Sequence, residues 1–299
     1  MEIALTRRIV PAHERKAFSP LDGEAIARRT HCLPPAFELI PRLLVLLDDP
    51  DVNAEKIADV IRLDAGLTAN VLQLANSVSF AAPRKTKSLS EAVVRVGLRE
   101  VFRAVVKTVT SPALTSQSSL DRQPINLWQH SLAAAVAAQV LARHLEVEDT
   151  ETAFTAGLLH DIGKVILAQA LAQDYIRVLE CCAENNRAIH IAEREAFLAD
   201  HTEIGGRVLR DWKFPDRIVA AVLRHHAPLT ATREHAPLAA LIYAANVLAY
   251  YVGRGAGYPE HVVHPDEHAL ELINLEKHTL LIYEEEVTEM IRREEERLC

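Results

Sequence analysis

The sequence predicts an almost all-α protein with two helical subdomains. Alanine and leucine dominate the apolar residues, which make up 49% of the 299 residues, and aromatic residues make up only 5%. Glycine and proline, which interrupt helices, number just 10 and 14. Because alanine and leucine favour helix while aromatic and β-branched residues favour strand, this composition indicates helices packed around a sizeable core.

The first residues are expected to form a leader ahead of the folded part. Residues 1–30 mix charged side chains with Pro11 and Pro20 and show no sustained apolar period, so we place no chemistry there. From Leu33 the sequence becomes apolar. The helix that follows is expected to end at the stop signal Asp48-Asp49-Pro50.

Polar caps and a glycine mark the next helices. Asn53 is placed as the N-cap of one helix, and Ser90 is expected to cap a later one. Gly97 interrupts the apolar pattern before a helix resumes at Leu98. Together these short helices are expected to form an N-terminal subdomain over residues 31–116.

A polar stretch over residues 111–124 predicts a linker, with a boundary near residue 120. The second subdomain is expected over residues 117–252. Its helices include Leu127–Leu145, a single helix over Thr152–Gln169, and one that runs into the doublet His225-His226.

Residues 253–299 are expected to be a helical C-terminal extension that follows a glycine-rich break. The last helix, near Glu284 to Leu298, is heavily charged. It either covers the body of the protein or pairs with another copy to form a homodimer, and the sequence leaves both alternatives open.

Charge and cysteine usage restrict the class of partner and the compartment. The net charge of −8 opposes binding to a phosphate backbone, so nucleic acid is not the expected partner. Basic residues between Arg84 and Lys107 keep a DNA-binding helical pair as a minor alternative. The four cysteines form no Cys-x-x-Cys pair, which favours a reducing cytoplasm, and no apolar stretch reaches the roughly 20 residues that span a membrane.

One histidine pattern predicts a metal site. His160 and Asp161 lie in the run Gly157–Lys164, and further histidines occur at helical positions on either side. Neutral imidazole and carboxylate suit one or two divalent ions such as Fe, Mn, Zn or Ni, and Asp161 can bridge two of them. The predicted ligands are His130, His160, Asp161, His201, His225 and His226, and Lys164 could neutralise a phosphate.

The alternative is that each histidine is an ordinary surface or hydrogen-bonded side chain. The set favours metal, because an ionised Asp161 in an apolar helix would be costly to bury without a partner. Nucleophilic hydrolysis and NTP-driven mechanics are unsupported, because neither a Gly-x-Ser-x-Gly elbow nor a phosphate-binding glycine loop is present.

The order of these histidines resembles the HD-domain superfamily of metal-dependent phosphohydrolases. Six further motifs resemble one branch of it, the HDOD domain of bacterial signalling proteins, over residues 33–228: Leu33-Pro-Pro, Arg42–Asp51, Leu72–Ser77, Trp128–Ser131, Asp200–Gly205 and Trp212–Pro215. The resemblance implies an HD-like helical bundle as the second subdomain, a bacterial cytoplasmic setting, and a regulatory role in which catalysis is usually unproven or lost.

Two departures from the catalytic relatives weaken the expected metal site. Asn246 stands where those enzymes use a late aspartate, and Asn126 stands where some have an acidic ligand one turn before the first histidine. Amide oxygens bind metal more weakly than carboxylates. The signature that follows the double histidine in cyclic-dinucleotide phosphodiesterases is also missing.

Two functions follow from these expectations. The first is a regulatory module without catalysis, which binds a protein partner of a signalling pathway or a small anionic ligand such as a nucleotide, and whose metals are weakly held. The second is a metal-dependent phosphohydrolase, acting on a nucleotide or cyclic dinucleotide, with Asp161 and Lys164 as catalytic residues and Asn246 as a further weak ligand.

Overall fold

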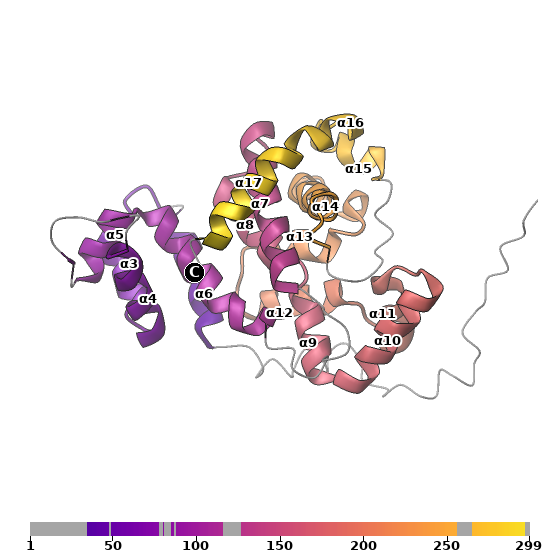
Figure 1. Cartoon of the computed structure of the whole chain (residues 1–299), viewed down its shortest axis with the longest axis horizontal. Helices are drawn as coiled ribbons and strands as arrows, with labels where there is room; N and C mark the ends of the chain where they lie inside the picture. Colours follow the sequence, from indigo (N-terminus) through magenta and orange to yellow (C-terminus); the bar gives the residue numbers. More distant parts are fainter. Residues whose placement is uncertain are drawn as a thin grey trace, which may run out of the picture.

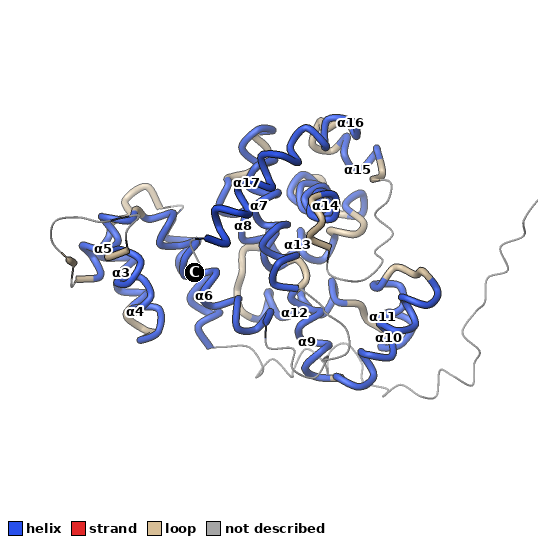
Figure 2. Tube along the Cα trace, in the orientation of Figure 1, coloured by secondary structure: helices blue, strands red, loops and turns tan. Residues whose placement is uncertain are grey.

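The computed structural model describes residues 35–47, 49–77, 80, 85–86, 88–115, 127–255 and 265–296. Every regular element in these ranges is a helix, so the predicted all-α fold is confirmed. Figure 1 and Figure 2 show a small N-terminal group of helices beside a larger bundle. The predicted leader, the boundary near residue 120 and Asn126 lie outside the described residues.

The N-terminal helices form a stack in which α3 and α4 both pack against α5, and α2 and α4 pack against α6. Each helix buries one apolar face; on α3 this face is formed by Ile57 and Ile61. The elements of the stack are η3 (Pro35–Glu38), α2 (Leu39–Leu47), α3 (Ala54–Ile61), α4 (Ala65–Ala75), α5 (Leu89–Val96) and α6 (Leu98–Thr115).

The predicted caps are right for one helix and wrong for another. Asn53 caps α3, with its side chain accepting a hydrogen bond of 3.0 Å from the N–H of Lys56. Helix α5 begins before Ser90, because Ser88 has the extended backbone of a cap and accepts from the N–H of Glu91. Gly97 separates α5 from α6 as predicted, and its φ of 92° is one that glycine adopts readily.

The second bundle is built around α7, which packs against α8, α14 and α17. Every residue of α7 from His130 to Ala142 is buried, as expected for a helix surrounded on all sides. The elements of the bundle are α7 (Leu127–Leu145), α8 (Thr150–Leu159), α9 (Ile162–Ala170), α10 (Ala172–Asn185), α11 (Ile189–Phe197), α12 (His201–Asp211), α13 (Asp216–Arg224), η5 (Pro228–Thr230) and α14 (Ala236–Tyr251).

The prediction of one continuous helix over Thr152–Gln169 is wrong. Helix α8 ends at Leu159 and α9 begins at Ile162, so His160 and Asp161 form the junction between them. The backbone of Asp161, with φ −101° and ψ 12°, leaves the helical region. No glycine or proline stands at the junction, so packing against other helices must impose the break.

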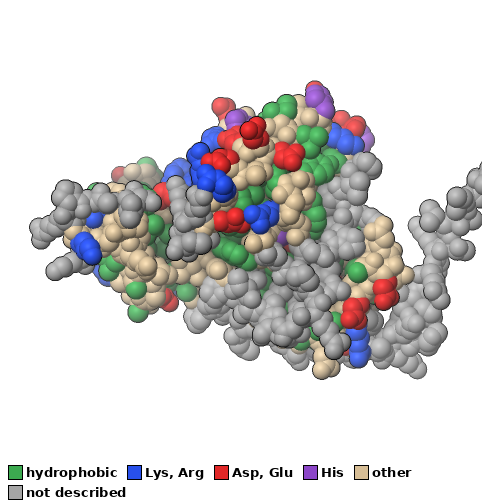
Figure 3. All heavy atoms as spheres, in the orientation of Figure 1, with side chains coloured by type: hydrophobic (Ala, Val, Ile, Leu, Met, Phe, Trp, Pro, Cys, Tyr) green, Lys and Arg blue, Asp and Glu red, His purple; other side chains and the backbone are tan. Residues whose placement is uncertain are grey.

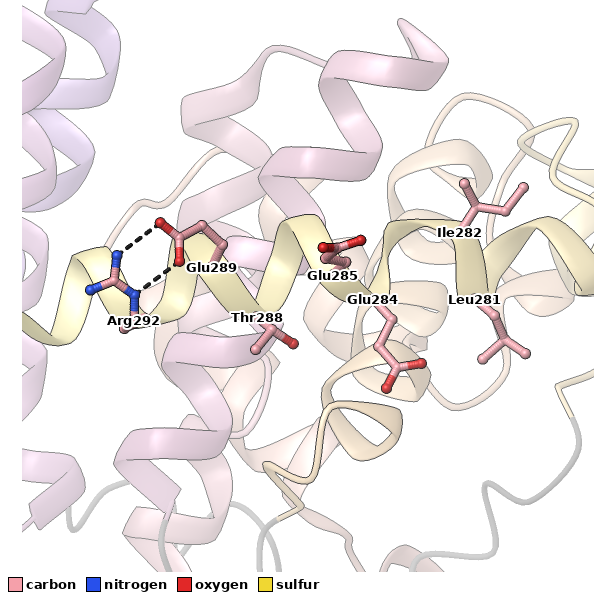
Figure 4. A pocket seen from close by; sticks show the side chains of 7 residues that line it. All are labelled: Leu281, Ile282, Glu284, Glu285, Thr288, Glu289 and Arg292. Carbon is pink, nitrogen blue, oxygen red and sulfur yellow. Dashed lines mark hydrogen bonds and ion pairs between the residues drawn. The ribbon is translucent and has the colours of Figure 1, made fainter.

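The C-terminal extension consists of α15 (Glu267–Glu271), α16 (Lys277–Leu280), η6 (Leu281–Tyr283) and α17 (Glu284–Glu296). Helix α17 packs on α7 and buries Val287, Ile291 and Glu294, which are spaced as one helical face. Its outer side is charged: Glu289 binds Arg292 there, beside a shallow groove that begins at Leu281 and Ile282 (Figure 4). The helix therefore covers the body, while pairing with a second copy stays a prediction.

The two groups of helices share one continuous hydrophobic core. Helix α6 packs against α7, α8 and α9, and Arg103 of α6 donates a hydrogen bond of 2.9 Å to Glu151 of α8. Acidic and basic side chains are interspersed over the surface where α17 lies (Figure 3). Among the described helices, none is both long and apolar enough to cross a membrane.

Candidate metal centre

Four histidines surround one carboxylate at the centre of the second bundle, and each of the five residues has a relative exposure of 0%. Each histidine comes from a different part of the bundle, and the carboxylate belongs to Asp161. His130 is on α7, His160 follows α8, His201 is the first residue of α12, and His225 follows α13.

The Nε2 atoms of these histidines face the two oxygens of Asp161. Those of His160 and His130 lie 3.4 and 3.6 Å from Oδ2. Those of His201 and His225 lie 3.4 and 3.8 Å from Oδ1. The candidate ligand atoms form two groups, each within 4.8 Å, one of His130, His160 and Asp161 and the other of His201, His225 and His226.

Two glycines of the central motif allow the helices to approach closely enough to build this cluster. A Cβ at Gly157 would lie 2.8 Å from the carbonyl oxygen of Ala134, on the helix that carries His130. A Cβ at Gly163 would lie only 1.9 Å from the carbonyl oxygen of His201 itself. The motif therefore supplies both ligands and the close contacts that bring the other ligands to them.

The hydrogen bonds at Nδ1 fix the tautomer of each buried histidine. Nδ1 donates to the carbonyl oxygen of Arg254 in His130, of Gly157 in His160 and of Val222 in His225, at 2.7 to 2.9 Å. A carbonyl can only accept, so each Nδ1 carries a proton. The Nε2 of a neutral ring then keeps its lone pair, as a metal ligand requires.

His201 is held differently, by a buried carboxylate that the sequence reasoning missed. Glu193 of α11 accepts from the Nδ1 of His201 at 2.6 Å and from its backbone N–H at 2.8 Å. Tyr175 donates to the other oxygen of Glu193 at 2.9 Å. One signal was readable: Glu193 lies on the buried stripe of α11 with Ile189, Ala192 and Phe197.

Burial and mutual charge set the protonation of the centre. Burial lowers the pKa of His160 to about 4 and that of His225 well below its usual value, because both rings are shut off from water and lie near other positive groups. Burial would raise the pKa of Asp161, but His160, Lys164 and His201 outweigh it and hold that pKa well below the ordinary range. Glu193 raises the pKa of His201 in spite of burial.

These residues fit a divalent metal. The Nε2 atoms of His130, His160 and His225 and the Oδ1 of Asp161 are buried with no hydrogen-bond partner, which is costly unless a cation binds them. The Nε2 atoms of His201 and His226 lie 3.1 Å apart, so they either share a proton or face a common cation. Neighbouring ligands with metal bonds of about 2.1 Å lie about 3.0 to 3.4 Å apart, close to the separations here.

Lys164 lies inside the cluster, where it is only 1% exposed. Its ammonium group donates to Oδ2 of Asp161 at 2.8 Å. The predicted bridging carboxylate and the predicted phosphate-binding lysine are thus bound to each other.

The two remaining predicted ligands are less well defined. His226 is partly buried, and its ring stacks on His190 with centroids 4.3 Å apart, a neighbour that the sequence reasoning did not single out. Asn246 is buried on α14. This helix packs against α7, which carries His130, and against α8 and α13, which end just before His160 and His225. The role of Asn246 as a ligand stays a prediction.

This fold and this cluster define an all-helical protein with a buried histidine and aspartate centre. The chain belongs to the HDOD domain family, whose family model matches residues 33–228. That span is the one over which the sequence motifs resemble the family.

Proteins of known sequence or structure are similar to this chain. An uncharacterized protein of Treponema pallidum (strain Nichols) is 25% identical over 258 residues, which is 86% of this chain and 50% of the relative. The chain thus spans about half the length of the curated relative it matches. An HDOD domain protein of unknown function from Geobacter sulfurreducens has a TM-score of 0.71 at 23% identity, covering 90% of this chain and 95% of that one.

Two further structures carry provisional descriptions. One, from Marinobacter aquaeolei VT8, is described as a signal transduction protein and has a TM-score of 0.71 at 23% identity over 96% of this chain and 63% of that one. The other, from Shewanella amazonensis SB2B, is described as a phosphohydrolase and has a TM-score of 0.60 at 22% identity over 87% and 93%. At these identities the similarity establishes the fold alone.

Proposed function

We propose that this chain is a bacterial signalling module that acts by binding, with a metal centre that is structural. Its partner is another protein of the signalling pathway, and a small anionic ligand such as a nucleotide is the alternative. The provisional signalling role of the Marinobacter relative supports this reading. The free thiols of Cys181 and Cys182 support a cytoplasmic setting.

The observation that carries this proposal is the buried pair of Asp161 and Lys164. A hydrolytic centre needs the carboxylate for metal and the lysine for substrate phosphate. Here the ammonium group already neutralises the carboxylate, and it is almost inaccessible to a substrate. The internal cation lowers the electrostatic attraction of the site for metal, so we expect a bound ion to be weakly held.

The ligands of such an ion would be His130, His160, His201, His225 and His226 with Asp161, and Asn246 would add a weak amide oxygen. The donor set suits Fe, Mn, Zn or Ni. When bound, a divalent ion supplies a Lewis acid that polarises a phosphoryl oxygen. The protein contributes the fixed Nδ1 hydrogen bonds, which hold the imidazole rings in place.

A phosphohydrolase is the second candidate function, and those fixed histidines favour it. The Nε2 atoms are presented as in a competent metal site, so a variant with a stronger site could be active. In that case Lys164 would leave Asp161 and bind the phosphate of a nucleotide or cyclic dinucleotide. Asn246 argues against full activity, because a neutral amide replaces a charged ligand.

The test is metal content together with hydrolysis. Protein without a histidine tag is assayed by inductively coupled plasma mass spectrometry, and for cleavage of bis(p-nitrophenyl) phosphate and cyclic dinucleotides with added Mn²⁺. The proposal predicts Mn²⁺ uptake that His225→Ala/His226→Ala abolishes, with no hydrolysis in wild type or in Asn246→Asp. Turnover in wild type or Asn246→Asp that His160→Ala abolishes would instead establish the phosphohydrolase.

A further inference from the structure

We propose that the C-terminal helix α17 tunes the metal centre, and that Arg254 is the positioning residue through which it acts. This inference rests on the proposed metal centre and assigns a regulatory input to it. The input is a helix at the protein surface, outside the matched HDOD span.

His130 is the one buried ligand of the four whose orientation depends on a distant, non-helical segment. His160 and His225 are held by carbonyl groups three residues earlier in their own chain segment, and His201 by Glu193 of the neighbouring helix. The Nδ1 of His130 instead donates, at 2.9 Å, to the carbonyl of Arg254, which lies beyond the end of α14. The position of that carbonyl therefore sets the direction of the His130 ring.

The side chain of Arg254 ties this carbonyl to α17. Its guanidinium donates to Glu295 of α17 at 3.0 Å and to Gln129 of α7 at 3.2 Å. Gln129 is the residue next to His130, so the two hydrogen bonds place Arg254 between α17 and the ligand. A shift of α17 would pull on the guanidinium and move the carbonyl that orients the ring.

Helix α17 is also tied to the N-terminal group of helices. Glu294, next to Glu295, forms a buried ion pair with Lys107 of α6. Figure 1 shows α17 running across α7 toward α6. Glu294 thus joins α17 to α6, and Glu295 joins α17 to the segment that orients His130. A partner that displaces α6 or α17 would therefore change metal affinity.

The strength of the ion pair between Arg254 and Glu295 limits how far metal affinity can change. Arg254 and Glu295 are 32% and 34% exposed, and such a half-exposed ion pair changes a coupled binding constant by at most about fivefold. We expect Arg254→Ala and Glu295→Gln each to weaken Mn²⁺ binding by about threefold to fivefold. The double variant should be no weaker than Arg254→Ala, because that single variant already removes the bond to Glu295 together with the bond to Gln129.

The experiment measures Mn²⁺ affinity of the full chain by isothermal titration calorimetry, with electron paramagnetic resonance of bound Mn²⁺ as a second readout. Glu286→Gln is the matched control. It removes the charge by which α17 binds Arg143 and His144 in the last turn of α7, and it leaves Arg254 untouched. Arg254→Lys keeps the positive charge and should recover part of the affinity. By reciprocity, added Mn²⁺ should slow hydrogen exchange of the α17 amides in wild type and slow it less in Glu295→Gln.

Each outcome decides the inference. Weaker binding in Arg254→Ala and Glu295→Gln, with Glu286→Gln like wild type, supports it, and the Glu295 variant suffices if Arg254→Ala does not fold. Mn²⁺ binding that is lost in His160→Ala but unchanged in Glu295→Gln overturns this inference and leaves the metal centre standing. A wild type that takes up no Mn²⁺ overturns both.

Discussion

Replacing Gly163 by alanine tests whether the close approach of α9 and α12 builds the metal centre. The added Cβ would lie 1.9 Å from the carbonyl oxygen of His201 and 2.7 Å from its carbonyl carbon. An ordinary contact needs about 3.2 Å or more, so the two backbones must separate by more than about 1 Å. Overpacking of this kind costs about 3 kcal/mol when the obstacle is backbone, and the better helix propensity of alanine returns at most about 1 kcal/mol.

The expected result is a loss of about 2 kcal/mol in the free energy of unfolding, measured by urea denaturation with far-ultraviolet circular dichroism. Mn²⁺ affinity should fall as well, because the separation displaces His201. Gly66→Ala is the control, since its Cβ meets only the capping side-chain oxygen of Asp64, at 3.1 Å, and it should change stability by less than about 1 kcal/mol and leave Mn²⁺ affinity unchanged. The reasoning is refuted if Gly163→Ala is as stable as wild type and binds Mn²⁺ equally well.

Three more predictions concern neighbours of the centre. Glu193→Gln removes the charge that holds His201 and should lower Mn²⁺ affinity about tenfold by calorimetry; an unchanged affinity would mean that this carboxylate does not support the ligand. Lys164→Met leaves Asp161 without its cation, which should cost about 3 to 5 kcal/mol without metal, and Mn²⁺ should raise the melting temperature of the variant more than that of wild type. Equal shifts would contradict this pairing. Burial raises the pKa of Cys182 from 9.0 to about 12, so its contribution to stability is complete below pH 9 and is lost as the pH rises toward 12. The free energy of unfolding should therefore fall less steeply above pH 9 in Cys182→Ala than in wild type, and identical slopes would argue against a buried neutral thiol.

The sequence predicted the helical fold, and its motifs pointed to the residues that the structure gathers around Asp161. The first prediction rests on composition, and the second rests on the His160-Asp161 motif together with the resemblance of the histidine order to the HD-domain superfamily. The cap of α5 was misplaced by two residues because Ser88 and Ser90 are both good cap residues, and only the backbone shows which one is extended.

The rest depends on tertiary contacts that leave little trace in a single sequence. The break at His160 and Asp161 has no local helix breaker, so packing decides it. Arg254 orients His130 through its carbonyl, a group that every residue has. Glu193 could have been noticed as a carboxylate on an apolar stripe, but nothing in the sequence connects it to His201.

The continuous core has a consequence for how this protein could be divided. With α6 packed on α7, α8 and α9 and Arg103 bound to Glu151, the polar stretch near residue 120 joins two parts of one cooperative unit. Thermal or chemical unfolding should then appear as a single transition, and a fragment cut at that stretch would expose apolar surface to water. Any longer protein that contains this domain would have to carry it as a whole, because the two groups of helices share one hydrophobic core.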